Sequence, residues 1–127
     1  LMVPKLRNVD QMSIQKIGEE LKSTSQLCRE LKIDKKEFFG GSMTISSLGG
    51  IGGTHFTPII NPPEVAILGV GRTFDRLVKE KNKIVSRKML PISLSYDHRL
   101  IDGAEGARFC VYLGKCLGKD FAFKLAV

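Results

Sequence analysis

His98 and Asp102, four positions apart, are the residues with the clearest potential for chemistry in this sequence. Both lie in the segment 95–103, which reads Ser-Tyr-Asp-His-Arg-Leu-Ile-Asp-Gly. A histidine takes up and returns a proton near neutrality because its unperturbed pKa is about 6.5. His98 is therefore a candidate general base. The bare pattern His-x-x-x-Asp-Gly is short, so alone it only raises this hypothesis.

The elements on either side of this segment would hold His98 in place. Apolar residues occupy every second position before it, which predicts a strand over 90–96. A helical pattern follows from about Gly103 to Leu117 and ends at Gly118. Asp102 and Glu105 form a capping-box-like pair at its start. His98 then sits at a strand end, where a rigid element can present a side chain to a cleft. The predicted buried face of the helix includes Ala104, Ala107, Val111 and Leu117.

A second polar candidate, Ser46, precedes a glycine-rich loop over 48–54. Polar and apolar residues alternate over 42–46, which predicts a strand that delivers Ser46 to this loop. The loop lacks the Gly-Lys-Ser/Thr ending of a P-loop, and no dinucleotide pattern fits it. We interpret its glycines as permitting tight turns and close backbone approach. One wall of a ligand channel is the alternative interpretation.

The rest of the chain predicts further helices and strands within one α/β domain. Ser13 is the predicted N-cap of a helix over 14–32 with one apolar stripe. Asp34 and Glu37 form a second capping pair over a short helical turn. A continuous apolar run predicts a buried strand over 64–70, and residues 74–78 and 84 onward predict a hairpin around 80–83. The apolar tail, 121–127, requires a surface to cover it.

Composition narrows the functional class. The chain has 127 residues, 43% of them hydrophobic, which is enough for one domain with a core. No apolar run reaches the roughly 20 residues that span a bilayer, and the first residues lack a basic leader, so we expect a cytoplasmic protein. The net charge of +7 is scattered among acidic residues, which favours a solvated surface over a nucleic-acid interface. Three cysteines without metal-ligand spacing predict free thiols and no metal site, with two of them buried in the last helix: Cys28, Cys110 and Cys116.

Three blocks of sequence together resemble the dihydrolipoamide acyltransferases, the core subunits of 2-oxo acid dehydrogenase complexes. These blocks are residues 40–53, residues 61–70 and the active-site segment 89–104. They occur in the family's order and at its spacing. Within the family they are most similar to the acetyl-transferring members of bacterial pyruvate dehydrogenase complexes.

The resemblance implies a fold and a domain organisation. The implied fold is the chloramphenicol-acetyltransferase type, a two-layer α/β sandwich with a mixed sheet and helices on one side. Residues 1–127 would form the C-terminal portion of the catalytic domain. Roughly the first half of that domain is expected to be absent from this stretch, as are the lipoyl and peripheral subunit-binding domains.

The resemblance also implies roles for individual residues in acetyl transfer between dihydrolipoamide and coenzyme A. His98 would deprotonate the attacking thiol, and the Ser46 hydroxyl would hydrogen-bond the oxyanion without becoming a nucleophile. Asp102 would pair with an arginine and so fix the setting of His98, or would act only as an N-cap. Ser46, Ser47 and Gly71 would line the coenzyme A site. His55 lies outside the motifs and has no assigned catalytic role.

The implied assembly is a homotrimer that joins into a larger core and works with pyruvate dehydrogenase and dihydrolipoamide dehydrogenase. The lipoyl group would be carried on a domain outside this chain. In the family, the histidine of one subunit faces the serine of its neighbour, and the apolar tail would dock on a neighbouring trimer. The alternatives are a non-catalytic oligomerisation fragment, a succinyl- or branched-chain-acyl-transferring relative, and an antibiotic acetyltransferase.

Overall fold

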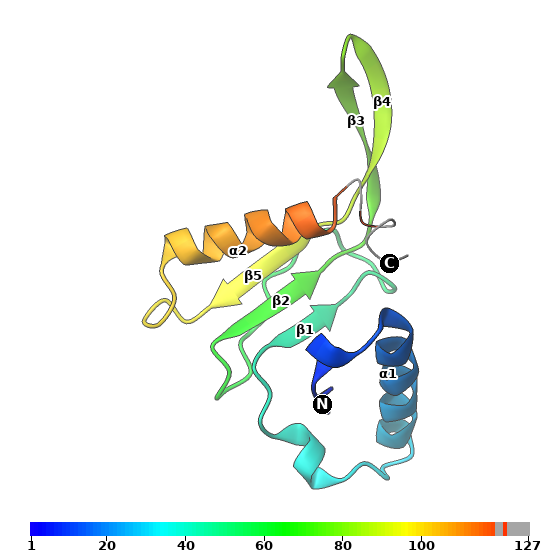
Figure 1. Cartoon of the computed structure of the whole chain (residues 1–127), viewed down its shortest axis with the longest axis vertical. Helices are drawn as coiled ribbons and strands as arrows, with labels where there is room; N and C mark the ends of the chain where they lie inside the picture. The colour runs from blue at the N-terminus through cyan, green and yellow to red at the C-terminus, as the bar shows by residue number, and fades with distance from the viewer. Residues whose placement is uncertain (119–120, 122–127) are drawn as a thin grey trace. The chain divides into compact units, whose positions relative to one another are not determined.

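The computed structural model describes residues 1–118 and 121, which form two compact units (Figure 1). One unit consists of Leu1–Ser42 with the end of the last helix from Lys115, and the other of Met43–Gly114. The predicted apolar tail lies outside the described residues except for Phe121. Among the described residues, no helix is both long and apolar enough to cross a membrane.

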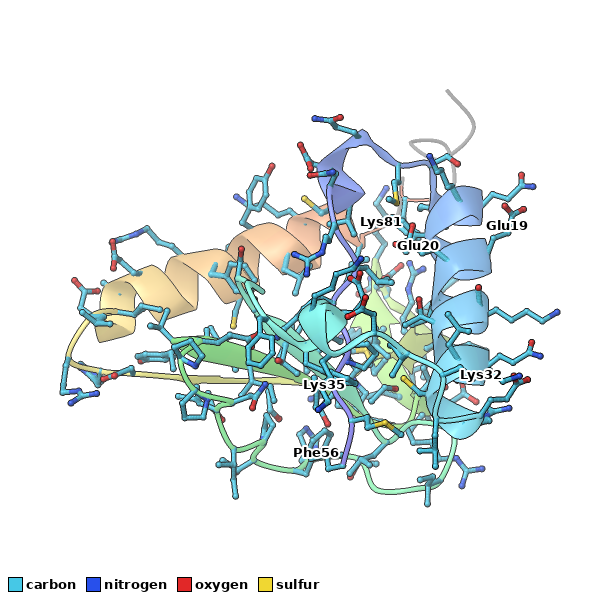
Figure 2. All side chains as sticks on the ribbon, turned by 90° about the horizontal axis from the view of Figure 1, so that it is seen from below. Glu19, Glu20, Lys32, Lys35, Phe56 and Lys81 are labelled. Carbon is cyan, nitrogen blue, oxygen red and sulfur yellow. The ribbon has the colours of Figure 1, made fainter. Side chains whose placement is uncertain are left out.

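The first 42 residues contain one α-helix and two short 3-10 turns, η1 (Val9–Gln11) and η2 (Lys35–Phe38). Helix α1 (Ile14–Arg29) begins where predicted, because the Ser13 side chain accepts a hydrogen bond from the Lys16 amide at 3.2 Å. Charged side chains such as Glu19 and Lys32 project into solvent on and beside this helix (Figure 2).

Helix α1 ends three residues before the predicted boundary. Leu31 adopts a left-handed conformation with φ of 56°. The Lys32 amide then donates to the Leu27 carbonyl at 2.9 Å, and the Leu31 amide donates to the Cys28 carbonyl at 3.1 Å. These two bonds close the helix in a Schellman motif. A leucine at the left-handed position is uncommon, so this helix end could not be predicted from residue types.

Turn η2 confirms the helical turn predicted after residue 34. The Asp34 carboxylate accepts a hydrogen bond from the Lys36 amide at 3.0 Å and caps the turn. Glu37, the other predicted capping residue, instead forms an ion pair with Arg7 at 3.2 Å.

The second unit is built on a mixed three-stranded sheet in the order β1-β2-β5. Strand β1 (Thr44–Ser47) runs parallel to β2 (Ala66–Val70), and β5 (Ile92–Tyr96) runs antiparallel to β2 on its other side. The central strand supplies the core of the described residues, where at most 9% of each side chain is exposed: Ala66, Ile67 and Leu68. The predicted mixed sheet is therefore confirmed.

Polar contacts also fix the start of this sheet. Glu64 precedes β2 and is buried, and the Thr44 hydroxyl of β1 donates a hydrogen bond to its carboxylate. Strand β1 begins two residues later than predicted and ends one residue later, so Ser46 lies within the strand.

The predicted hairpin is present, with longer strands than expected. Strands β3 (Phe74–Glu80) and β4 (Lys83–Met89) pair antiparallel as a separate two-stranded sheet. The connecting residues Lys81 and Asn82 both have positive φ, 42° and 66°, which is the conformation of a type I′ hairpin turn.

Helix α2 (Gly103–Cys116) packs on the sheet through a different face from the one predicted. Gly106 is its buried residue, and the Tyr96 ring of β5 lies against it. Ala104, Ala107 and Val111, assigned to the buried face, are exposed. Leu117, also assigned to that face, has 41% of its surface exposed. Apolar residues occur on all sides of this helix, so periodicity alone does not identify the buried face.

The cysteines of the described residues are free thiols, as predicted. Cys110 and Cys116 were predicted to be buried in the last helix, but both are half-buried.

Candidate active site

The chain turns tightly between the end of β5 and the start of α2 (Figure 1), and His98 is a residue of this turn. The Asp97 amide donates to the Val65 carbonyl at 2.8 Å, which ties the turn to the residue before β2. The Asp97 carbonyl accepts hydrogen bonds from the Leu100 and Ile101 amides, both at 3.0 Å. The backbone on each side of His98 is thus fixed, while the His98 side chain itself is exposed.

The Asp97 carboxylate closes the same turn from its other side. Its Oδ1 accepts the Arg99 amide at 3.0 Å, which is an Asx-turn. The Arg99 guanidinium donates to both carboxylate oxygens, with the shortest contact 2.6 Å from Nη2 to Oδ2. These side-chain hydrogen bonds, followed by the bond from the Arg99 amide, lower the pKa of Asp97 to about 2. We call this pair the Asp97–Arg99 clip.

Tyr96 places an aromatic ring beside His98. The two ring centroids are 5.6 Å apart and the planes are inclined by 40°. The space for the Tyr96 ring exists because position 106 carries no side chain, since a Cβ there would lie 2.8 Å from Tyr96 Cε1. A Cβ on Gly103 would lie 4.0 Å from His98 Nε2, so the imidazole reaches the first turn of α2.

Asp102 is the N-cap of α2, as predicted. Its Oδ1 accepts the Glu105 amide at 2.8 Å, and its carbonyl accepts the Gly106 amide at 3.1 Å. Among the described residues, Arg99 pairs with Asp97 and no ion pair involves Asp102. Pairing of Asp102 with an arginine therefore stays a prediction.

Ser46 and His98 of one chain do not lie together. In the sheet register Ser46 is opposite Gly69, and Gly69 is opposite Ser93 of β5. From Ser93 to Tyr96 the strand rises by about 10 Å, and two strand spacings add roughly 9.6 Å across the sheet. The Ser46 and Tyr96 Cα atoms are therefore separated by about 14 Å, and His98 lies further along the chain. The strand register thus separates Ser46 from the strand end that leads to His98.

The two predicted coenzyme A residues lie near the glycine-rich loop. Ser47 follows Ser46, so the two side chains point to opposite faces of β1, Ser46 half-buried and Ser47 exposed. At Gly71 a Cβ would collide with the Thr54 carbonyl oxygen and lie 2.9 Å from its carbon. Gly71 also donates its amide to the Pro91 carbonyl at 3.0 Å. Close backbone packing thus requires glycine here, whereas contact with coenzyme A stays a prediction.

The remaining predicted features add no further polar site. His55 is exposed in the loop that follows the glycine-rich segment. In the part of the chain that the structure describes, no three His, Cys, Asp or Glu residues are placed to hold a metal ion. The sequence interpretation missed Asp97, although an aspartate immediately before the histidine with an arginine two residues on is the local pattern of an Asx-turn.

Comparisons with known proteins match nearly the whole chain to a single family. A family model described as 2-oxoacid dehydrogenases acyltransferase (catalytic domain) matches residues 1–122. A protein of Cupriavidus necator, the dihydrolipoyllysine-residue acetyltransferase component of the pyruvate dehydrogenase complex, is 46% identical over 121 residues. That alignment covers 95% of this chain and 22% of the relative.

Two solved structures are similar in fold and sequence, each covering 99% of this chain and 51% of the solved chain. One is the cubic core of a pyruvate dehydrogenase multienzyme complex, with a TM-score of 0.91 and 45% identity. The other is dihydrolipoamide acetyltransferase of Azotobacter vinelandii, with a TM-score of 0.91 and 46% identity. These matches confirm the predicted chloramphenicol-acetyltransferase type of fold. The chain spans about half of these solved chains and about a fifth of the Cupriavidus relative.

The Azotobacter structure comes from a study of the catalytic roles of one serine, one histidine and one asparagine. In that enzyme the serine and the histidine are 52 positions apart, and the asparagine follows the histidine by four positions.

Proposed function

The chain belongs to the family of 2-oxoacid dehydrogenase acyltransferase catalytic domains, and from this premise we propose that its protein moves an acetyl group between dihydrolipoamide and coenzyme A. The spacing of the polar residues carries the proposal. Ser46 and His98 are 98 − 46 = 52 positions apart, and Asp102 follows His98 by 102 − 98 = 4. Both separations equal those of the residues studied in the Azotobacter enzyme. This chain has an aspartate where that spacing reaches an asparagine.

In the proposed reaction His98 acts as the general base. It takes the proton from the coenzyme A thiol, and the resulting thiolate attacks the thioester carbonyl of acetyl-dihydrolipoamide. A thiol with a pKa of about 8.5 is within reach of an imidazole base. The tetrahedral intermediate then collapses, the bond to the dihydrolipoamide sulfur breaks, and that sulfur takes the proton back from His98.

Ser46 stabilises the intermediate in this proposal. Its hydroxyl donates a hydrogen bond to the oxyanion that forms when the thiolate adds to the carbonyl. A preorganised donor of this kind lowers the barrier by about 3–4 kcal/mol. Asp102 holds the start of α2 through its bond to the Glu105 amide and so keeps the turn that carries His98 in place. Ser47 and Gly71 are proposed to line the path of coenzyme A.

A complete site requires two copies of the chain. Because Ser46 lies about 14 Å from Tyr96, at the strand end that leads to His98, we infer that the serine serving one histidine comes from a neighbouring copy. We propose a homotrimer that joins into a larger core, as the related cubic core suggests. Its partners would be pyruvate dehydrogenase and dihydrolipoamide dehydrogenase in the cytoplasm, with the lipoyl group delivered from a separate domain.

Single substitutions in the assembled protein test the function. His98→Ala should lower the rate of acetyl transfer by about 10²–10⁴-fold, the range of general base catalysis. Ser46→Ala should lower it by about 10²–10³-fold. His55→Ala is the matched control for loss of an exposed imidazole and should leave the rate unchanged. Transfer at the wild-type rate by folded His98→Ala would remove His98 from the mechanism.

A further inference from the structure

Every polar group of Asp97 is used to hold the turn that carries His98. Its amide donates to Val65, and its carbonyl accepts from Leu100 and Ile101. Its carboxylate accepts the Arg99 amide at 3.0 Å and the Arg99 guanidinium at 2.6–3.2 Å. The residues immediately before and after His98 are thus joined to each other by side-chain and backbone bonds.

We propose that Asp97, with Arg99, is a positioning residue for His98, acting through the conformation of the turn. This inference rests on the proposed function, in which His98 is the general base. A catalytic group must be held within about 0.5 Å and 10–20° of its productive geometry. His98 is exposed apart from its contact with the Tyr96 ring, so packing restrains its side chain on one side only, and the conformation of its backbone must supply much of the remaining restraint.

The chemistry of the clip suits a permanent restraint. The Asp97 side chain is only 20% exposed, whereas that of Arg99 is 88% exposed. An exposed ion pair contributes little stability by itself, about 0–1 kcal/mol. The Asx-turn and the two-oxygen contact instead define the direction of the chain at residues 97–99. Asp97 also remains ionised at neutral pH because its pKa is about 2, so the clip stays closed wherever the histidine base works.

The chain contains a matched control for the clip. Asp34 makes the same arrangement with Lys36: its Oδ1 accepts the Lys36 amide at 3.0 Å, and its Oδ2 pairs with the Lys36 ammonium at 3.3 Å. This second Asx-turn caps η2 in the first unit and brackets no histidine. Loss of Asp34 therefore reports what such a turn contributes to folding alone.

The test is a steady-state comparison of the assembled protein with acetyl-coenzyme A and dihydrolipoamide. Asp97→Ala should lower kcat by about 10–100-fold, the scale of a displacement of about 1 Å, while KM for both substrates changes less than about twofold. Asp97→Asn keeps an oxygen that can accept the Arg99 amide, and should recover most of the lost kcat. Asp34→Ala should leave kcat and both KM values at their wild-type levels.

Each outcome decides the proposal. Folded Asp97→Ala with kcat near the wild-type value contradicts it, and so does an equal loss of kcat in Asp34→Ala. If Asp97→Ala does not fold, Arg99→Ala provides the decision: a drop of at least about threefold in kcat at constant KM supports the clip, and unchanged kcat overturns it. Two other results would contradict the proposed function itself rather than the role of Asp97. These are a wild-type protein that transfers no acetyl group, and a His98→Ala variant that transfers it at the wild-type rate.

Discussion

Two glycines of α2 differ in what an added methyl group would meet, and this difference tests whether the Tyr96 ring supports His98. In Gly106→Ala the new Cβ would lie 2.8 Å from Tyr96 Cε1 and 3.1 Å from Cζ. Carbon atoms normally pack at about 3.5–4.0 Å, so the ring must move by roughly 0.7–1.2 Å. In Gly114→Ala the Cβ meets nothing within 4 Å. Both changes replace glycine with alanine in the same helix, so the second is a matched control.

The expected free energies follow from two opposing effects. Alanine is more favourable than glycine in a helix interior by about 1 kcal/mol. Gly114→Ala should therefore raise the free energy of unfolding by up to that amount. Overpacking costs about 1–3 kcal/mol, so Gly106→Ala should change it by between roughly zero and a loss of about 2 kcal/mol. Denaturant unfolding of the two variants should then differ by about 1–3 kcal/mol.

Catalysis should separate the two variants more strongly than stability does. The Tyr96 ring centroid lies 5.6 Å from that of His98, so displacement of the Tyr96 ring changes the position that the His98 ring can occupy. A misplacement of about 1 Å can cost about 10²-fold in rate. We expect at least a tenfold loss of kcat for Gly106→Ala and no loss for Gly114→Ala. Equal kcat in the two folded variants would refute a supporting role for Tyr96.

Two further predictions concern backbone packing and acid stability. Gly71→Ala should destabilise the protein by about 1–3 kcal/mol, because its Cβ would collide with the Thr54 carbonyl. Gly50→Ala is the control and should not change stability, because nothing lies within 4 Å of the added Cβ. Equal melting temperatures of the two variants in thermal unfolding would count against the described packing. The Asp97 pKa is lowered to about 2 by Arg99 from an unfolded value of about 3.9, so the clip should stabilise the fold fully above about pH 4 and lose this effect as the pH falls toward 2. Urea midpoints of wild type and Asp97→Asn should therefore differ at pH 6 and converge as the pH approaches 2, and a constant difference would contradict the assignment.

The parts of the fold that follow from local chemistry could be predicted from the sequence. Alternating apolar residues predicted β5, and the capping residues Ser13 and Asp102 predicted the starts of both α-helices correctly. The end of α1 could not be predicted, because it depends on Leu31 in a left-handed conformation that leucine rarely adopts. The prediction of the buried face of α2 was wrong because apolar residues occur on all sides of this helix. Contact with the Tyr96 ring determines that Gly106 is the buried residue.

In the candidate site, too, local features could be predicted from the sequence and non-local ones could not. His98 and Ser46 could be named from motifs, but their separation within one copy depends on the strand register, which is a non-local property. Asp97 was missed because its role is visible only when its amide, carbonyl and carboxylate are all seen to close one turn.

Subunit mixing shows whether Ser46 of one copy serves His98 of another. Ser46→Ala and His98→Ala proteins, each nearly inactive alone, are combined in equal amounts under conditions of subunit exchange, and native mass spectrometry verifies the mixed trimers. In a head-to-tail ring, an interface regains both intact residues with a probability of ½ × ½, so acetyl transfer should return to about a quarter of the wild-type rate. Mixed trimers with no more activity than the separate variants would contradict the claim.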